Sequence, residues 1–331
     1  MNSTRTPRPG RSWGAPSRAF RLFTLLSLGP AVQITFLGTA GSWPTKERSA
    51  SAIALDMEKE VILLDCGEGT QRQLFRSPVS FMRVRRVLIT HFHGDHFLGL
   101  PGLIQSMGLN NRTEPLDVYG PRGAREFVEM ILRLGYFTQK FPVAVHEMAP
   151  GDVLDLGSYA VRAAAARHPV PALAYRVEEK EKRGRFDAEK ARSLGMRGAD
   201  FARVEAGETL TIGGRVISPD LVLGPPRPGR SVTYSGDSSP APEVIQLARG
   251  SDVLIHEATT AEDLEAEANE WGHSSAHQAA EIAREAGVGL LFLTHFSSRY
   301  PEAEPLEAEA RRTFPESHAA QDLREHLLRQ R

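Results

Sequence analysis

The sequence predicts an α/β fold in which two β-sheets lie between two layers of helices. Short apolar, β-branched runs alternate with helical patterns at residues 84–134 and 231–313, and a β-meander at residues 32–65 precedes them. Hydrophobic residues make up 41% of the 331 positions and charged residues 24%, which is typical of a globular protein and excludes a disordered, collagenous or coiled-coil chain. Because sheets must cover their apolar faces, a layered sandwich follows.

The first half of the chain contains most of the expected strands. Within the meander, we expect turns at residues 38–41 and 57–60, which separate the apolar runs. The run VRRVLIT predicts a strand at 84–90, and a helical pattern follows it at 95–109. The full set is strands at 32–37, 51–56, 61–65, 84–90, 116–120, 144–147, 159–165 and 172–177, with helices at 95–109 and 122–134.

The second half repeats the alternation of strands and helices. We expect residues 31–316 to form one domain and residues 317–331 to form a C-terminal tail. The elements predicted here are strands at 231–237, 252–258 and 289–295, with helices at 240–248, 275–286 and 302–313.

The alternation breaks at an insert, residues 178–228. Eight basic and seven acidic side chains crowd residues 178–205, a density that leaves little apolar surface for a core layer. A solvated helical hairpin or linker is one interpretation. The other is a protruding arm that contacts a large polyanionic substrate. The stiff segment LGPPRPGR then returns the chain to the next strand.

Charge and cysteine content exclude several classes of protein. The formal net charge of −1 excludes a globally basic nucleic-acid coat, so any RNA or DNA contact must use local basic patches. Cys66 is the only cysteine, which excludes an internal disulfide and a cysteine-based zinc finger. The 11 histidines must therefore supply any metal site.

The N-terminal 30 residues have a different composition from the rest. They hold five arginines and no acidic residue, followed by an apolar run at 22–28 that is too short to cross a bilayer. A disordered leader and a targeting segment both fit this pattern. Neither interpretation requires a segment that spans a membrane, so we expect a soluble cytoplasmic protein.

The segment VLITHFHGDHFLGLPGL gathers metal-binding side chains directly after an apolar strand. His91 and His93 are two residues apart in extended backbone, so their side chains point to one face. Gly94 allows a sharp turn that brings Asp95 and His96 beside them. Imidazole nitrogens and a carboxylate oxygen suit Zn²⁺, and we expect these four residues to bind it.

Further ligands are expected at the ends of other apolar strands, where open α/β sheets place their sites. His168, Asp237 and His295 occupy such positions, and together they complete two metal shells. His256 and Glu257 end a fourth strand of this kind. Four other histidines lack this context and are interpreted as surface or structural residues: His146, His277, His318 and His326.

The pattern H-x-H-x-D-H, followed by distant His, Asp and His, resembles the metallo-β-lactamase superfamily. The longer string THFHGDHFLGLPGL is similar to the ribonuclease Z family, endonucleases that trim tRNA 3′ ends. FLGTAGSWPTKERS, LLDCGEGTQRQL, HEAT, GHSSAHQAAEIAREAG and LTHFSSRY agree, and the similarity runs from about residue 32 to residue 300. It implies a metallo-β-lactamase fold, an αββα four-layer sandwich with an inserted protruding arm.

The resemblance also implies two zinc ions per chain. A hydroxide at the bridging position would attack a phosphodiester, and Asp95 would orient or deprotonate the attacking water. The implied ligands are His91, His93 and His168 for the first ion, Asp95, His96 and His295 for the second, and Asp237 as the bridge.

His273 is implied as the general acid that protonates the leaving O3′, with Glu257 holding its ring. The sequence places His273 independently. Ser275 and Gln278 form a possible capping box, so His273 lies on the loop just before a helix. The candidate phosphate-binding residues are Arg299, as a bidentate fork, and Lys46 and Arg48 on the first loop.

The implied function is removal of the 3′ trailer from precursor tRNA, which leaves a 3′-hydroxyl on the tRNA. The resemblance further implies a homodimer in which each arm serves the partner's active site. The Gly-Pro pair found in bacterial-type arms is absent from residues 193–210. Two alternatives are a phosphodiesterase or other hydrolase acting on a small substrate, and a non-catalytic RNA-binding protein, which the complete ligand set disfavours.

Overall fold

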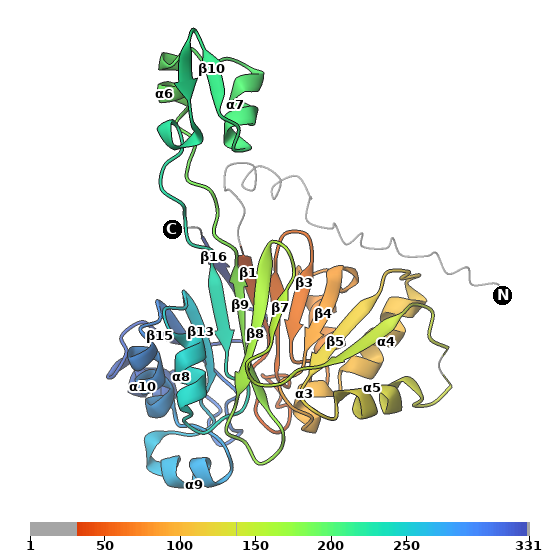
Figure 1. The fold of residues 1–331 in the computed structure, drawn as a ribbon. Helices are drawn as coiled ribbons and strands as arrows, with labels where there is room; N and C mark the ends of the chain where they lie inside the picture. The colour runs from red at the N-terminus through yellow and green to blue at the C-terminus, as the bar shows by residue number, and fades with distance from the viewer. Residues whose placement is uncertain (1–31, 137, 330–331) are drawn as a thin grey trace, which may run out of the picture.

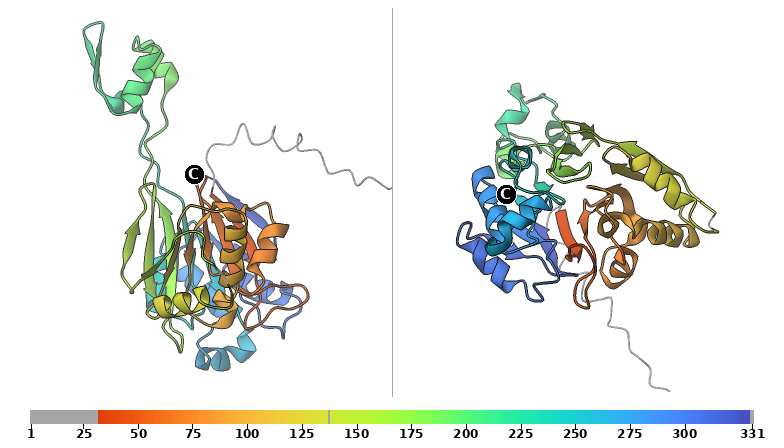
Figure 2. Two further views of the ribbon diagram at one scale, coloured as in Figure 1. Left: turned by 90° about the vertical axis from the view of Figure 1, so that its right-hand side faces the viewer. Right: turned by 90° about the horizontal axis from the view of Figure 1, so that it is seen from below.

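The computed structural model describes residues 32–136 and 138–329, and it has the architecture of an αββα sandwich (Figure 1). Two seven-stranded mixed sheets face each other, and helices cover their outer faces (Figure 2). The predicted fold class is therefore confirmed. The leader expected at residues 1–30 lies outside the described residues.

The first sheet has the strand order β16-β1-β2-β3-β4-β5-β6. Its β1–β3 part is the expected antiparallel meander, and β3 to β6 run parallel. Helix α2 was missed by the sequence patterns because it is short and buries only three of its residues. The elements are β1 (Val32–Gly38), β2 (Ala52–Asp56), β3 (Val61–Leu64), α2 (Thr70–Arg76), η1 (Phe81–Arg83), β4 (Val84–Leu88), α3 (Gly94–Phe97), α4 (Leu100–Leu109), β5 (Leu116–Gly120), α5 (Ala124–Leu132) and β6 (Val143–Glu147).

The second sheet has the order β15-β14-β13-β12-β9-β8-β7. Strands β12 to β15 run parallel, while β9, β8 and β7 continue the sheet antiparallel. The elements are β7 (Val153–Asp155), β8 (Tyr159–Ala165), β9 (Leu173–Glu179), β12 (Ser231–Tyr234), α8 (Pro242–Ala248), β13 (Val253–Glu257), η3 (Glu262–Leu264), α9 (Glu265–Glu270), α10 (Ala276–Ala286), β14 (Leu290–Thr294) and α11 (Glu304–Arg311).

Three apolar layers hold the sandwich together. Between the sheets, Phe36 and Leu64 of the first sheet pack with Tyr175 and Ile255 of the second in one buried cluster. Two further clusters lie under the outer helices, one against each sheet. Buried apolar area is the main stabilising contribution, at about 25 cal/mol per Å², so both sheets are rigid supports for the loops at their ends.

The carboxyl ends of the parallel strands in both sheets lie at one end of the sandwich, near α3 and α9 in Figure 1. The insert leaves from the other end. It departs after β9 and returns at the start of β12, which are antiparallel neighbours. Because β9 has seven residues, the two ends of the sheet are separated by about 20 Å.

The insert projects from the sandwich as a small separate unit (Figure 1). Backbone pairing joins its two connecting segments at Lys182–Arg227 and Phe186–Leu223. Its buried apolar residues are spread singly along the segment, between charged and polar residues, so the sequence pattern does not indicate a core there. The elements are α6 (Ala188–Ser193), α7 (Ala199–Glu205), β10 (Leu210–Ile212), β11 (Arg215–Ile217) and η2 (Pro219–Leu221), and the buried residues are Ala191, Met196, Val204, Leu210, Ile217 and Val222.

The end of the chain differs from the tail expected at residues 317–331. Strand β15 (Ser317–Ala319) pairs parallel with β14, and β16 (Glu325–Leu328) pairs antiparallel with β1. These residues therefore complete both sheets. Strands of three and four residues carry too few side chains to show a period of two, so no sequence pattern predicts them. Within residues 32–136 and 138–329, no helix is long and apolar enough to cross a membrane.

Candidate metal centre

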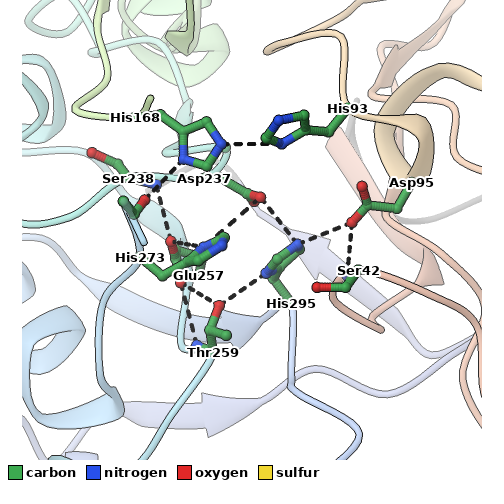
Figure 3. Close-up of polar contacts among 12 residues, drawn as sticks. Ser42, His93, Asp95, His168, Asp237, Ser238, Glu257, Thr259, His273 and His295 are labelled. Carbon is green, nitrogen blue, oxygen red and sulfur yellow. Dashed lines mark hydrogen bonds and ion pairs between the residues drawn. The ribbon is translucent and has the colours of Figure 1, made fainter. Parts of the chain in front are cut away.

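The seven predicted ligands converge on one centre between the two sheets. Figure 3 labels five of them: His93, Asp95, His168, Asp237 and His295. Each belongs to a loop at the carboxyl end of a strand or to the hairpin that joins β8 to β9. Four come from the loop and short helix after β4, one from the β8–β9 connection, one from the loop after β12 and one from the end of β14: His91, His93, Asp95 and His96; His168; Asp237; and His295.

The first cluster consists of His91, His93 and His168. His168 Nε2 lies 3.2 Å from His93 Nδ1. The ring centroid of His91 lies 4.7 Å from that of His93 and 4.7 Å from that of His168. Three imidazoles that turn nitrogens toward one point form a donor set that suits Zn²⁺.

The second cluster consists of Asp95, His96, His295 and Asp237. His96 Nε2 lies 3.4 Å from His295 Nε2, and Asp95 Oδ2 is within 3.4 Å of both nitrogens. Asp237 Oδ2 lies 3.3 Å from His96 Nε2 and 3.1 Å from His295 Nε2. It is also 3.6 Å from His91 Nε2 in the first cluster, so this one oxygen reaches both clusters.

Two buried polar atoms show that the residues fit a pair of cations. His91 Nε2 and Asp237 Oδ1 have no hydrogen-bond partner among the described residues, although both side chains are buried. An unpaired buried polar atom is costly, and a coordinated ion would remove that cost. Burial and the neighbouring His96 lower the pKa of His91 well below 6.5, which favours the neutral imidazole that a metal requires.

Asp65, at the end of β3, orients two of the ligands. Its Oδ2 accepts a 2.7 Å hydrogen bond from His96 Nδ1. The Thr90 hydroxyl donates to Asp65 at 2.9 Å and lies 3.1 Å from His91 Nδ1, from which it can accept. With both Nδ1 atoms engaged, each ring directs Nε2 to the centre. Tyr234 also donates to Asp65, at 2.9 Å.

Glu257, at the end of β13, holds two more imidazoles in the same way. Its Oε1 lies 2.9 Å from His273 Nδ1. Its Oε2 accepts a 2.6 Å hydrogen bond from the Thr259 hydroxyl, which lies 3.0 Å from His295 Nδ1. The carboxylate is fully buried and also accepts from the backbone N–H of Ser238. Glu257 therefore supports one predicted metal ligand and the predicted general acid.

His273 lies on the loop before α10, as the sequence predicted. Ser275 and Gln278 form the capping box that begins this helix. Burial lowers the pKa of His273, but the charge of Glu257, its hydrogen bond and, to a smaller extent, Asp237 outweigh burial and raise the pKa to about 9. This direction favours the protonated ring, which a proton donor requires.

Strained backbone marks two of these positions. Asp65 and His295 have positive φ angles, 59° for both, directly after β3 and β14. A left-handed conformation in a residue other than glycine costs of the order of 1–3 kcal/mol and clusters at functional sites. The strain turns each side chain out of its sheet and into the centre.

The three predicted phosphate-binding residues lie in different settings. Lys46 and Arg299 are exposed. The guanidinium of Arg48 instead donates to the carbonyls of Tyr300, at 2.7 Å, and Pro301, at 2.9 Å. These contacts indicate that Arg48 fixes the two loops to each other.

Cys66 and several histidines lie outside the two ligand clusters. Cys66 is fully buried, and burial raises the pKa of its thiol to about 12. His256 donates from Nδ1 to the Glu257 carbonyl and does not belong to a described metal-ligand cluster. The same holds for the four histidines interpreted as surface or structural residues.

Sequence reasoning missed Asp65, Thr90 and Thr259. Asp65 could have been found, because it ends the apolar run VILLD just as Asp237 and His295 follow apolar runs. The two threonines carry no such signal. Each is recognised only when the carboxylate and the imidazole on either side of its hydroxyl are placed in space.

Comparisons with known proteins agree with this geometry. A model described as "Anti-Pycsar protein Apyc1" matches residues 32–147, and one described as "Beta-lactamase superfamily domain" matches residues 220–296. The chain is 49% identical to "Ribonuclease Z" of Methanothermobacter thermautotrophicus, over 88% of this chain and 95% of that one. It is 42% identical to "Ribonuclease BN" of Cronobacter sakazakii, over 88% and 98% respectively.

The crystal structure of the short form of human tRNase Z superposes with a TM-score of 0.66 at 29% identity, covering 89% of this chain and 98% of that one. Each of these matches covers nearly nine-tenths of the chain. The chain therefore belongs to the ribonuclease Z family of the metallo-β-lactamase superfamily, a family of hydrolytic endoribonucleases.

Proposed function

We propose that this chain is a zinc-dependent endoribonuclease that removes the 3′ trailer from precursor tRNA. The observation that carries the proposal is the complete ligand set, in two clusters that share Asp237, beside His273, whose Nδ1 lies 2.9 Å from the Glu257 carboxylate. Relatives named for ribonuclease Z supply the substrate class. A cytoplasmic location remains a prediction.

The proposed metal sites follow the two clusters. His91, His93 and His168 would hold one zinc ion, and Asp95, His96 and His295 the other. Asp237 would serve both, because its Oδ2 lies within 3.6 Å of nitrogens in each cluster. Two zinc ions held there would acidify water and neutralise charge on a phosphodiester.

The chain's own residues account for the proton transfers. Asp95, whose side chain is 9% exposed, orients a water molecule for attack on phosphorus and accepts its proton. The water oxygen forms a bond to phosphorus as the P–O3′ bond breaks. His273 gives its proton to the departing O3′, so the tRNA ends in a 3′-hydroxyl and the trailer carries a 5′-phosphate.

The position of the arm supports a homodimer. The arm leaves the sandwich at the end opposite the metal centre (Figure 1), so the arm of one chain extends away from its own site. A second chain could place its arm beside that site. The arm's eight basic residues between 178 and 205 would then meet tRNA phosphates, which position a substrate without reading its sequence.

Incubation of the purified protein with a 3′-extended tRNA transcript tests the proposal, with product ends mapped. We expect a single cut that yields a 3′-hydroxyl on the tRNA. Hydrolysis of bis-p-nitrophenyl phosphate without any cut in the transcript would instead favour the alternative, a hydrolase of small phosphodiesters on the same fold.

A further inference from the structure

Two exposed tryptophans lie beside the metal centre. The side chain of Trp43 is 60% exposed and that of Trp271 is 45% exposed. Large aromatic rings normally contribute to a core, so exposed rings next to a catalytic centre point to a ligand with an aromatic surface. The third tryptophan, Trp13, lies outside the described residues.

Trp271 is fixed close to the general acid. It precedes Gly272, whose carbonyl lies 3.0 Å from His168 Nδ1 and accepts its hydrogen bond. Gly272 has a φ of 83°, and a Cβ there would lie 2.4 Å from Pro169, so this turn is closely packed. Trp271 is therefore held one residue from a contact to a metal ligand and two residues from His273.

Arg299 lies over the Trp271 ring, with its guanidinium carbon 5.5 Å from the ring centroid. A cation above one face stabilises the ring orientation and leaves the other face available. Since Arg299 is also the candidate phosphate fork, the pair places a stacking surface and a phosphate donor side by side. This combination is typical of sites for single-stranded nucleic acid.

The segment that carries Trp43 contacts the centre from the side of Asp95. The neighbouring backbone N–H of Ser42 donates to Asp95 Oδ2 at 2.8 Å. Gly41 is packed so closely that a Cβ would lie 2.7 Å from His295 Nδ1. Trp43 lines a shallow cavity of about 160 Å³ with Asp95 and the exposed Leu98. Figure 3 shows Ser42 and Asp95 on one side of the centre and His273 on the other.

We propose that Trp271 and Trp43 stack on the bases of the two nucleotides that flank the cleaved bond. The inference rests on the proposed function, which supplies an RNA strand across the centre. His273 protonates the O3′ of the tRNA nucleotide, so Trp271 takes the last base of the tRNA. Trp43, on the side of Asp95, takes the first base of the trailer.

Paired substitutions in enzyme and substrate test the proposal. Stacking is worth about 1–3 kcal/mol per base, so Trp271→Ala should raise the Kd for precursor tRNA by about 5- to 150-fold. The increase should disappear when the last tRNA nucleotide is abasic. Trp43→Ala should show the same behaviour with an abasic first trailer nucleotide. When a tryptophan variant is combined with the abasic nucleotide assigned to the other tryptophan, the two losses of binding free energy should be additive. Trp271→Phe should recover part of the affinity.

Binding is measured in a Trp13→Phe, His273→Ala background, so that zinc remains, cleavage is slow and quenching reports Trp43 and Trp271. Phe75, an exposed aromatic residue on α2, gives the control Phe75→Ala, which should change nothing. An equal loss of affinity on intact and abasic substrates would overturn the proposal. Loss of bis-p-nitrophenyl phosphate hydrolysis by either variant, in a chain that retains His273, would also overturn it.

The outcome is separable from that of the proposed function. If the native chain does not cut precursor tRNA, the same variants are measured with an unstructured ribo-oligonucleotide and abasic positions within it. Base-dependent loss of binding there supports stacking by the two rings, and its absence refutes stacking.

Discussion

Replacement of Glu257 by Gln should move the alkaline limit of activity to lower pH. Glu257 Oε1 lies 2.9 Å from His273 Nδ1, and the carboxylate is fully buried, so its charge is poorly screened at the ring. Burial lowers the pKa of His273, whereas Glu257 and, less strongly, Asp237 raise it to about 9. Without the Glu257 charge, the pKa of His273 should fall toward its ordinary value of about 6.5.

The size of the effect follows from the protonated fraction of His273. Near pH 8, a pKa of about 9 leaves roughly nine-tenths of the imidazole protonated, whereas a pKa of about 6.5 leaves roughly 3%. Cleavage of RNA should therefore fall by about 30-fold near pH 8 and by less than about twofold near pH 6. His273 stays protonated at pH values below its raised pKa. The rate therefore falls as the pH rises through that pKa.

The assay is a pH–rate profile of kcat on precursor tRNA, with zinc content measured at each pH. Bis-p-nitrophenyl phosphate has a leaving group that needs no proton, so its profile should keep its alkaline limb. Asp65→Asn is the matched control, because it makes the same change behind the metal ligand His96. It should reduce zinc affinity by about 10- to 100-fold but leave the alkaline limb of the pH–rate profile at its native pH. A loss in Glu257→Gln that is equal at all pH values would refute the assigned role.

Three further changes test other parts of the proposal. Asp237→Ala should lower zinc at both sites, because Oδ2 reaches nitrogens in both clusters; a fully loaded, active variant would falsify the bridging role. His273→Ala should keep zinc and fold but lose about 10²- to 10⁴-fold on RNA, with a smaller loss on bis-p-nitrophenyl phosphate. Replacement of residues 180–222 by a short Gly/Ser linker should raise KM for precursor tRNA and make KM less sensitive to salt, because the phosphate contacts that salt weakens are gone. It should spare small-substrate hydrolysis and zinc content; loss of both activities together would mean that the arm supports the sandwich.

The spacing of apolar residues and the polar residues at strand ends were enough to predict most of the sandwich and the convergence of its ligands. The run VRRVLITHFHGDH carries both signals, because the apolar strand fixes an edge and the polar residues follow it directly. A short element has no such period. This is why α2, β15 and β16 were missed, although β15 and β16 complete the two sheets.

The support around the ligands was less accessible to sequence reasoning. Thr90 lies next to its imidazole in sequence, but its carboxylate, Asp65, is 25 residues away. Thr259 joins Glu257 to His295, and His295 lies 36 residues after Thr259 in the sequence. Contacts of this kind depend on strand register, which a single sequence does not specify. The arm's small core was missed for another reason, since its apolar residues are spread across the segment between charges.

The two buried carboxylates, Asp65 and Glu257, support different residues of the centre, so their variants should have different effects on zinc binding. Asp65 reaches His96 directly and His91 through Thr90, so it supports one ligand in each cluster. Glu257 reaches His295 through Thr259 and the proton donor His273 directly. A change at Asp65 should therefore weaken both zinc ions together, whereas a change at Glu257 should weaken at most one of them. Zinc counts on the two variants separate these outcomes, and equal losses would show that the clusters cannot be occupied independently.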